Sequence, residues 1–298
     1  MIVVRNCEGF DELEACIRLQ VETWGYDPGD VIPRKVYQLA QKIGGQVMGA
    51  FDTEIAGAGE RGGPDSLVGF AMALPGVKNH AVPPQPYLHS HMLAVREDYR
   101  NRGLGAQLKR EQRLEALGRG IQLMEWTFDP LEIKNAYLNL HKLGVVVRGY
   151  LENFYGSSTS RLQGGLPTDR LVAEWWMDSP RVQAALLTRS AKSASESHPF
   201  ARKKRKDGAP TSQDLGAGSI EGSSVSSTGE KIEERIQVPA SIYEWKASET
   251  GRDRALAVQL ENRSKFQRAF SQGLVVVGFT RDAEGNGIFE LGHWTQQS

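Results

Sequence analysis

A short stretch, YRNRGLGAQL from Tyr99 to Leu108, combines two arginines and two glycines where an apolar segment gives way to a helical pattern. Backbone N–H groups in the first turn of a helix lack partners, and the helix dipole adds partial positive charge there. Glycine lets a backbone approach a ligand closely, and arginine adds charge-assisted hydrogen bonds. The stretch therefore predicts an anion-binding turn, with tight strand-to-helix packing as the alternative.

This turn differs from two common phosphate-binding motifs. No Gly-Lys-Ser/Thr follows it, so it is not a Walker loop. Counted from Gly103, the sixth position of a G-x-G-x-x-G motif is Leu108. The turn and the order of elements instead resemble the GNAT family of N-acetyltransferases. Its signature, Arg/Gln-x-x-Gly-x-Gly/Ala, is matched by Arg100, Gly103 and Gly105.

The resemblance implies an α/β (α+β) fold, with a mixed, mostly antiparallel sheet and helices on both faces. It covers roughly residues 1–155, and GLPTDRLVAEWW further on is similar to a bacterial group described only as predicted GNAT proteins. Family members bind the pyrophosphate of acetyl-CoA through backbone amides of this turn. Carried over, the coenzyme cradle consists of Arg100, Asn101, Arg102, Gly103, Leu104, Gly105 and Ala106.

Two further positions follow from the same resemblance. In the family, the strand before the turn splays from its neighbour, and its backbone binds the pantetheine arm. Leu93 to Val95 stand at that place. Asn135 matches an asparagine that often contacts the coenzyme. The co-substrate expected is therefore acetyl-CoA or another acyl-CoA.

The sequence departs from the family where a general acid is expected. Many members carry Tyr-x-x-x-Gly at the end of a later helix, and the tyrosine protonates the departing thiolate. Counting back from Gly144, this sequence has Leu140 there. Tyr137 lies close by on the helix and either substitutes or belongs to the core. A general acid is also dispensable in principle, since a thiolate is a tolerable leaving group near neutral pH.

Candidate bases come from the motif strand, because attack on a thioester requires a neutral amine. Several family members use a glutamate on this strand as the base. Counting back from Val95, this sequence has His89 at that position. Strand alternation predicts that His91 lies on the same face. The ordinary histidine pKa near 6.5 suits this role. Glu22, acting through water, is a further candidate. Alternatively, the two histidines are half-buried polar residues without a catalytic role. No third residue lies at the sequence spacing typical of zinc ligands, so no metal site is predicted.

The acceptor amine is expected between the first helix and a following hairpin loop. The segment 22–33, ETWGYDPGDVIP, is rich in acids and aromatic residues, and Glu22 and Asp27 would orient a cationic amine. Its aromatic residues alternatively close the core under a loop. EWW at residues 174–176 either lines the cleft from the other side or packs inside the sheet.

Hydrophobic periodicity predicts the elements that position these residues. Apolar residues at helical spacing predict helices over 10–24, 104–117, 129–143 and 253–271. The helix over 104–117 has Leu104, Leu108, Leu114 and Leu117 on one face. Asp129 and Glu132 form a capping box for the helix over 129–143. Strand-like segments lie at 2–4, 44–51, 66–74, 86–95, 121–128, 145–156, 170–177, 274–279 and 287–294.

Composition divides the chain. Residues 1–187 are expected to form the acetyltransferase domain, and 232–298 an α/β extension packed on it. Between them, 188–231 is rich in Ser, Gly, Ala and charge and is expected to be a disordered linker or insertion that folding does not need. Its basic run, Arg202 to Lys206, suggests either a nucleic-acid patch or, preferably, a solvated charge cluster, because no aromatic residue interleaves it.

Net charge and cysteine content narrow the range of partners and cellular compartments that we expect for this protein. Lys plus Arg and Asp plus Glu both number 36, and no apolar run is long enough to span a membrane, so neither nucleic acid nor a membrane is an expected partner. Two cysteines fit a reducing, cytoplasmic setting. The prediction is an acyltransferase acting on a small-molecule or peptide amine, as monomer or homodimer; a non-catalytic acyl-CoA-binding protein is the alternative.

Overall fold

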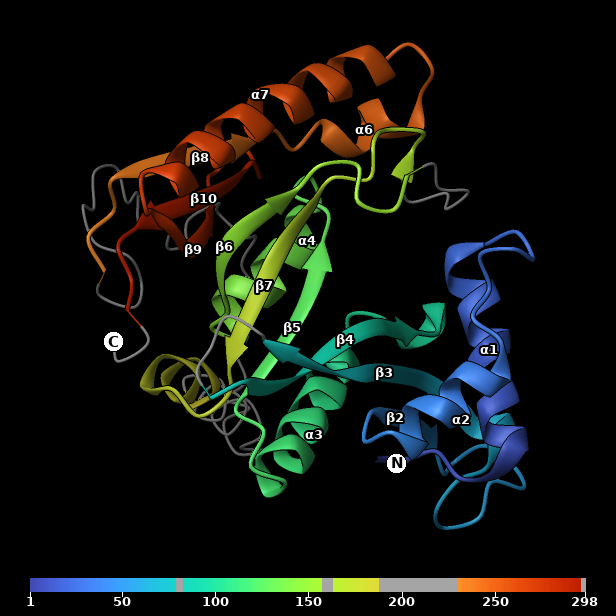
Figure 1. Cartoon of the computed structure of the whole chain (residues 1–298). Coiled ribbons are helices and arrows are strands. Elements are labelled where there is room, and N and C mark those ends of the chain that lie inside the picture. Colours follow the sequence, from blue (N-terminus) through green and yellow to red (C-terminus); the bar gives the residue numbers. More distant parts are fainter. Residues whose placement is uncertain (79–82, 157–162, 188–229, 296–298) are drawn as a thin grey trace, which may run out of the picture.

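The computed structural model describes residues 1–78, 83–156, 163–187 and 230–295 (Figure 1). Its strands form one ten-stranded sheet in the order β1-β2-β3-β4-β5-β7-β6-β9-β10-β8. The strands are β1 Ile2–Asn6, β2 Gln46–Asp52, β3 Leu67–Lys78, β4 Gln85–Val95, β5 Leu123–Phe128, β6 Val146–Leu151, β7 Arg170–Trp176, β8 Glu234–Val238, β9 Val275–Arg281 and β10 Gly287–Gly292.

Helices cover both faces of the sheet. They are α1 Gly9–Trp24, α2 Arg34–Lys42, α3 Leu104–Gly118, α4 Ile133–Ala136, which continues as a π-helical turn η3 Tyr137–Lys142, α6 Ile242–Ala247 and α7 Arg252–Ser271; short 3₁₀ turns are η1 Pro64–Ser66 and η2 Glu97–Tyr99. Side chains alternate along β4, so Met92 and Ala94 pack with α1 and α2, whereas Leu93 and Val95 pack with α3. The mixed, mostly antiparallel sheet with helices on both faces confirms the predicted fold class.

The β4–β5 pair creates an opening in the sheet. It is the one parallel pair in the described sheet, and it extends over just two residue pairs, Leu88–Met124 and His89–Glu125. Beyond these pairs β4 continues to Val95 and β5 continues to Phe128, and the two strands form no further residue pairs. The two strands therefore splay apart, as the family resemblance implied.

The C-terminal segment continues the same sheet. Strand β6 pairs with β9 at Val147 and Val276, and β10 joins β9 to β8. Helix α7 lies across this half of the sheet (Figure 1), and its Phe266 packs in the same core cluster as Trp175 of β7. The proposed division into domains stays a prediction, and the 188–229 part of the insertion, including its basic run, lies outside the described residues.

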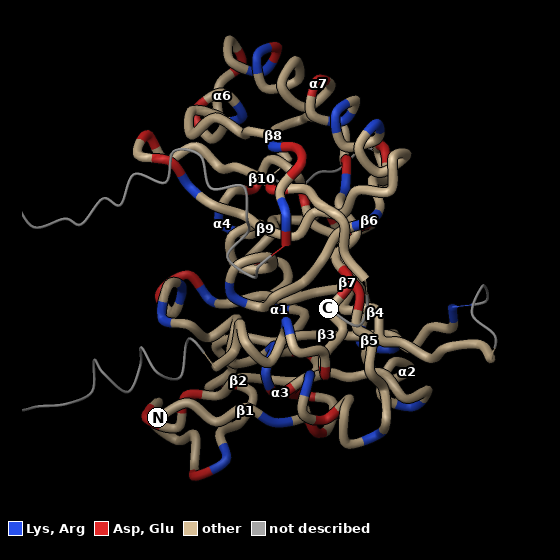
Figure 2. The backbone as a smooth tube through the Cα atoms, turned by 90° about the vertical axis from the view of Figure 1, so that its left-hand side faces the viewer, with Lys and Arg blue, Asp and Glu red and all other residues tan. Residues whose placement is uncertain are grey.

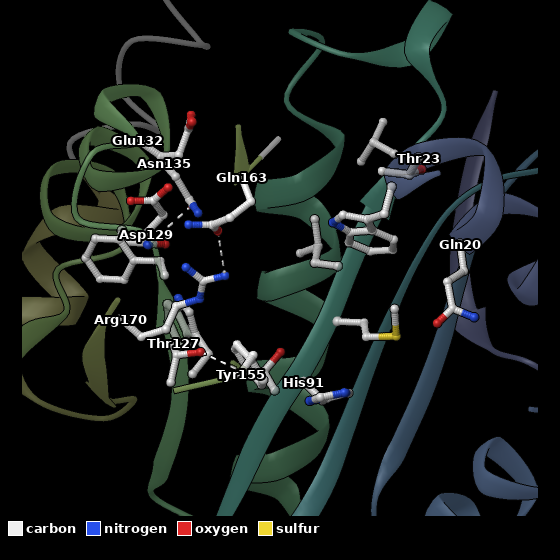
Figure 3. Close-up of a pocket in the computed structure, with 18 of the residues that line it drawn as sticks. Gln20, Thr23, His91, Thr127, Asp129, Glu132, Asn135, Tyr155, Gln163 and Arg170 are labelled. Carbon is white, nitrogen blue, oxygen red and sulfur yellow. Dashed lines mark hydrogen bonds between the residues drawn. The ribbon is translucent and has the colours of Figure 1, made fainter. Parts of the chain in front are cut away.

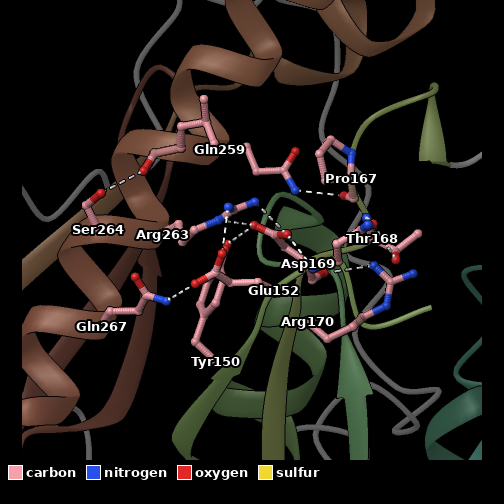
Figure 4. A network of polar contacts seen from close by, with 12 residues as sticks. Tyr150, Glu152, Pro167, Thr168, Asp169, Arg170, Gln259, Arg263, Ser264 and Gln267 are labelled. Atoms are coloured by element: carbon pink, nitrogen blue, oxygen red, sulfur yellow. Dashed lines mark hydrogen bonds and ion pairs between the residues drawn. The ribbon is translucent and has the colours of Figure 1, made fainter. Parts of the chain in front are cut away.

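A buried ion pair joins α7 to the start of β7 (Figure 4). Asp169 is fully buried and accepts hydrogen bonds from Arg263 Nε and Nη2, both at 2.9 Å. Its carboxylate also accepts from the Tyr150 hydroxyl at 2.6 Å and from the Asn153 amide at 2.9 Å. The residue before β7 is thereby held by α7 and by the end of β6 with the turn that follows it.

We expect Arg263→Ala to lower the free energy of unfolding by about 3–5 kcal/mol, because it leaves the Asp169 carboxylate buried without its cation. Urea denaturation measures the loss. Arg268→Ala on the same helix is the matched control, since Arg268 pairs with Glu234 while its side chain is 58% exposed, and this should cost about 1 kcal/mol or less. Equal losses in the two variants would contradict the role given to the buried pair.

Two local predictions are wrong. The residue before α4 is Glu132 rather than Asp129, whose carboxylate instead accepts a hydrogen bond from the Leu131 amide at 2.8 Å. Lys246 of α6 binds both carboxylates, at 2.8 Å from Asp129 and 3.2 Å from Glu132. The inward face of α3 also differs from the predicted apolar stripe. Leu114 is 52% exposed, whereas Lys109 and Gln112 are buried.

The surface carries charges of both signs. Basic and acidic residues are interspersed over both halves of the molecule (Figure 2). Across the described ranges, no helix has the length and apolar character needed to cross a membrane, and no group of three or more His, Cys, Asp or Glu is arranged to hold a metal ion. Cys7 and Cys16 are buried free thiols with their sulfur atoms 3.7 Å apart.

Candidate active site

The turn before α3 presents unpaired backbone amides. Asn101 and Gly103 both adopt left-handed backbone conformations, with φ of 62° and 82°. Helix α3 begins at Leu104, and the first helical amide with a backbone partner in the turn is that of Ala106, which donates to the Gly103 carbonyl at 3.1 Å. Within the described structure, the amides of residues 101–105 have no protein acceptor. Successive free amides of this kind form an anion-binding concavity.

The two arginines of the turn point to different places. Arg100 donates from Nε to the carbonyl of Val95 at 3.1 Å and lines the main pocket. Arg102 lies over the ring of Tyr99, 5.1 Å from its centroid, and lines a separate hollow of about 250 Å³ with Asp52. Arg100 is therefore the arginine that adds charge to the concavity at the pocket.

A pocket of about 600 Å³ passes through the opening between β4 and β5 (Figure 3). Gln20 and Thr23 of α1 lie on one wall, and Asn135 and Arg170 lie across from them. The predicted pantetheine strand forms part of the lining through Leu93 and Val95, as does the predicted coenzyme contact Asn135.

The two histidines of β4 have different environments. Met72 pairs with Met92 but Ala73 pairs with Ser90, so His91 is an extra residue in a β-bulge. His91 lines the pocket, whereas His89 is half-buried outside its lining. The alternation that was expected to put them on one face is thus interrupted, although their ring centroids are 6.2 Å apart.

Their pKa values also differ in the structure. Burial, with the nearby charges of His91, Lys109 and Lys78, lowers the pKa of His89 to about 4. The His91 side chain is exposed at the pocket, and its partial desolvation there lowers the pKa of His91 below the ordinary value. Both imidazoles are neutral at pH 7, and His91 is the one that can meet a ligand.

Several residues expected at the acceptor cleft lie elsewhere. Glu22 is exposed and outside the pocket lining, where its charge acts on Arg96. Asp27 is also absent from the lining, and Asp30 occurs there instead. The hairpin loop 53–66 contributes no lining residue.

The aromatic residues expected near the cleft fall into two groups. Trp24 and Tyr26 stack with centroids 5.7 Å apart; they line the pocket and also pack against the core under α1. Trp175 is fully buried and donates to the Leu143 carbonyl at 2.8 Å, and Trp176 packs in a separate cluster. The EWW segment therefore packs inside the sheet.

The sequence of residues 34–144 matches the model of the acetyltransferase (GNAT) family. This part of the chain is similar to that family. It contains the free-amide turn, the splayed strand β4 and Asn135. No curated protein matches the sequence.

Solved structures with similar folds include several acetyltransferases. Arabidopsis thaliana NAA60 in complex with acetyl-CoA aligns with a TM-score of 0.48 at 15% identity, over 60% of this chain and all of that one. The Escherichia coli ribosomal-protein-S18-alanine N-acetyltransferase aligns with a TM-score of 0.42 at 16% identity, over 58% and 92% of the two chains. Aminoglycoside 6'-acetyltransferase type Ii gives 0.43 at 19% identity, over 59% and 97%.

The GNAT domain holds no tyrosine where the family's general acid is expected. Leu140 is buried in the core at 2% exposure. Tyr137 stacks on His141 with centroids 4.6 Å apart and lies outside the pocket lining. Tyr137 packs against the core, which was the second of its two predicted alternatives, and η3 brings no tyrosine hydroxyl to the pocket.

Sequence reasoning missed several residues of the pocket, among them Lys109, Tyr155 and Arg170. The helical periodicity of α3 predicted an apolar buried face, so Lys109 was not expected to be buried. Its position next to Leu108, which is fully buried, was the one hint in the sequence. Tyr155 lies in the turn after β6 and Arg170 is the first residue of β7, so their contribution to the pocket depends on how the two strands pair. Arg170 is held by Gln163, which accepts a hydrogen bond at 3.2 Å, and lies over Tyr155 (Figure 3).

Proposed function

We propose that this protein is an acyl-CoA-dependent N-acyltransferase that moves an acetyl or other short acyl group from CoA to an amine by direct attack. The observation that carries the proposal is the free-amide turn at residues 101–105, which is placed beside a pocket that passes through the sheet. One end of this arrangement suits the pyrophosphate, and the strand backbone at Leu93 to Val95 suits the pantetheine arm.

The acceptor would enter from the α1 side. There Thr23 has a buried hydroxyl without a hydrogen-bond partner in the described structure, and it lines the pocket. Asp30 adds a carboxylate to the lining. Asp129 and Glu132 already bind Lys246, so they contribute less negative charge to an incoming amine. Coenzyme and acceptor would then meet from opposite sides of the splay.

We assign the proton acceptor to His91. It lies on β4 where the thioester end of the coenzyme would arrive, and its lowered pKa keeps the imidazole neutral near pH 7. A neutral imidazole can take the proton that the attacking amine loses.

We expect the purified protein to release free CoA thiol from acetyl-CoA in the presence of one or more members of an amine panel, and mass spectrometry to find the acetylated amine. The panel should include small-molecule amines and peptides with free amino termini. Thiol release without acetylated product would indicate hydrolysis and contradict the proposal.

A non-catalytic acyl-CoA-binding protein is the second candidate. The observation that favours it is Leu140, buried where the family's proton-donating tyrosine is expected. Calorimetric titration with acetyl-CoA does not separate the two candidates, because both bind the coenzyme. Binding without thiol release for any amine or acyl-CoA would favour the second.

A further inference from the structure

One buried amine in the pocket has no role in the scheme above. Lys109 of α3 is 4% exposed, yet it lines the pocket. Its ammonium donates to Ser90 Oγ at 2.7 Å, lies 3.9 Å from Met124 Sδ and stands 3.9 Å from the centroid of the Trp126 ring. No carboxylate of the described chain forms an ion pair with it. Burying an amine without a countercharge is costly, and such residues cluster at functional sites.

The ammonium of Lys109 lies at the end of the opening where β4 and β5 still pair. Ser90 follows directly after the last β4 residue that pairs with β5, and Met124 belongs to the first pair. From Val95 back to Ser90 the strand spans roughly 16 Å, which is comparable to an extended pantetheine arm. A coenzyme with its pyrophosphate at the turn and its arm along β4 would therefore bring its sulfur close to Lys109.

The side of approach separates donor from acceptor. Lys109 extends from α3, whose Leu104 and Leu108 pack on the same face of the sheet as Leu93 and Val95. The acceptor side is formed by α1, which packs on the opposite face. Lys109 thus reaches the pocket from the coenzyme's side, facing the leaving group rather than the attacking amine.

We infer that Lys109 donates the proton required by the departing CoA thiolate, and so replaces the tyrosine missing at position 140. This inference rests on the proposed acyl transfer. The acceptor nitrogen forms a bond to the thioester carbon, and the carbon–sulfur bond breaks with its electron pair on sulfur. A proton passes from Lys109 to sulfur, giving free CoA thiol, while His91 takes the proton lost by the nitrogen. Exchange with water restores both side chains.

The electrostatic surroundings support this role. Burial lowers the pKa of Lys109 to about 7, close to the range in which a thiolate is protonated. Titratable groups on the packed elements include His89 and His91 on β4 and Glu125 on β5, which pairs with Lys78. Helix α3 itself also carries Arg110, Glu111, Arg113 and Glu115. The two histidines are neutral near pH 7. An acid of this pKa should give a rate that falls as pH rises above about 7.

The test measures single-turnover acetyl transfer from pH 5 to 9 for the wild type, Lys109→Met and Tyr155→Phe. Methionine matches the length of the lysine stem and suits an apolar site. Lys109→Met should slow transfer by about 10²-fold, remove the decline above pH 7 and leave acetyl-CoA binding unchanged in calorimetry. Tyr155→Phe is the control that removes a tyrosine hydroxyl of the pocket lining, one that hydrogen-bonds Thr127 at 3.0 Å, and it should keep that decline.

A second acyl donor separates proton donation from a structural role. A selenolate leaves without protonation more readily than a thiolate, so Lys109→Met should lose less than tenfold with acetyl-selenocoenzyme A. Equal losses of rate with both donors would overturn the inference. So would a fall in rate above pH 7 that persists in Lys109→Met or disappears in Tyr155→Phe. The proposed acyl transfer would stand in each case. A wild-type protein that transfers nothing from either donor would refute the proposed function itself.

Discussion

Gly103→Val is expected to weaken acetyl-CoA binding by about 100-fold. Gly103 has φ of 82°, which a β-branched residue adopts only with strain. The new side chain would also stand where the pyrophosphate approaches the turn. Losing two charge-assisted amide-to-phosphate bonds at about 1.5 kcal/mol each gives a change of this size. Calorimetric titration with acetyl-CoA measures it.

Gly120→Val is the matched control for backbone strain. Gly120 follows the same helix at its other end with φ of 76°, and an added Cβ there would meet no atom within 4 Å. Both variants should lose comparable thermal stability, because both force valine into a left-handed conformation. Gly120→Val should keep its coenzyme affinity. If Gly103→Val binds acetyl-CoA as tightly as Gly120→Val does, the pyrophosphate lies elsewhere.

His91→Ala is expected to lower kcat/KM by 10²–10⁴-fold, the range typical of a lost general base. The base must be neutral to accept a proton, so kcat/KM of the wild type should fall with acid as the pH passes below the pKa of His91. Since partial desolvation lowers that pKa, the fall should lie below the ordinary value of 6.5. It should disappear in His91→Ala.

His89→Ala is the control, since it removes the neighbouring imidazole on the same strand from outside the pocket lining. It should change kcat/KM far less. The pH profile gives an independent check, because a base with the pKa of His89 would lose activity only near pH 4. A profile that falls near pH 4 and is abolished by His89→Ala would instead assign the base to His89.

Local sequence was sufficient to predict the glycine turn that opens α3. Gly103 in a left-handed conformation, with α3 starting at the next residue, follows from interactions within a few residues of chain. The same holds for the main strands and helices, because hydrophobic periodicity reports which face of each element is buried. The signature Arg100-x-x-Gly103-x-Gly105 predicted the family that the match of residues 34–144 bears out.

Tertiary structure decided the chemistry inside the pocket. The bulge that places His91 there depends on the register between β3 and β4, which strand alternation alone does not contain. Lys246, more than a hundred residues away in sequence, takes the two acids expected to cap α4. Lys109 faces inward because its helix packs over the splay, where a polar side chain can line a pocket. Periodicity records the average polarity of a face, whereas the contacts that set a side chain's pKa and its access to a ligand come from segments distant in sequence.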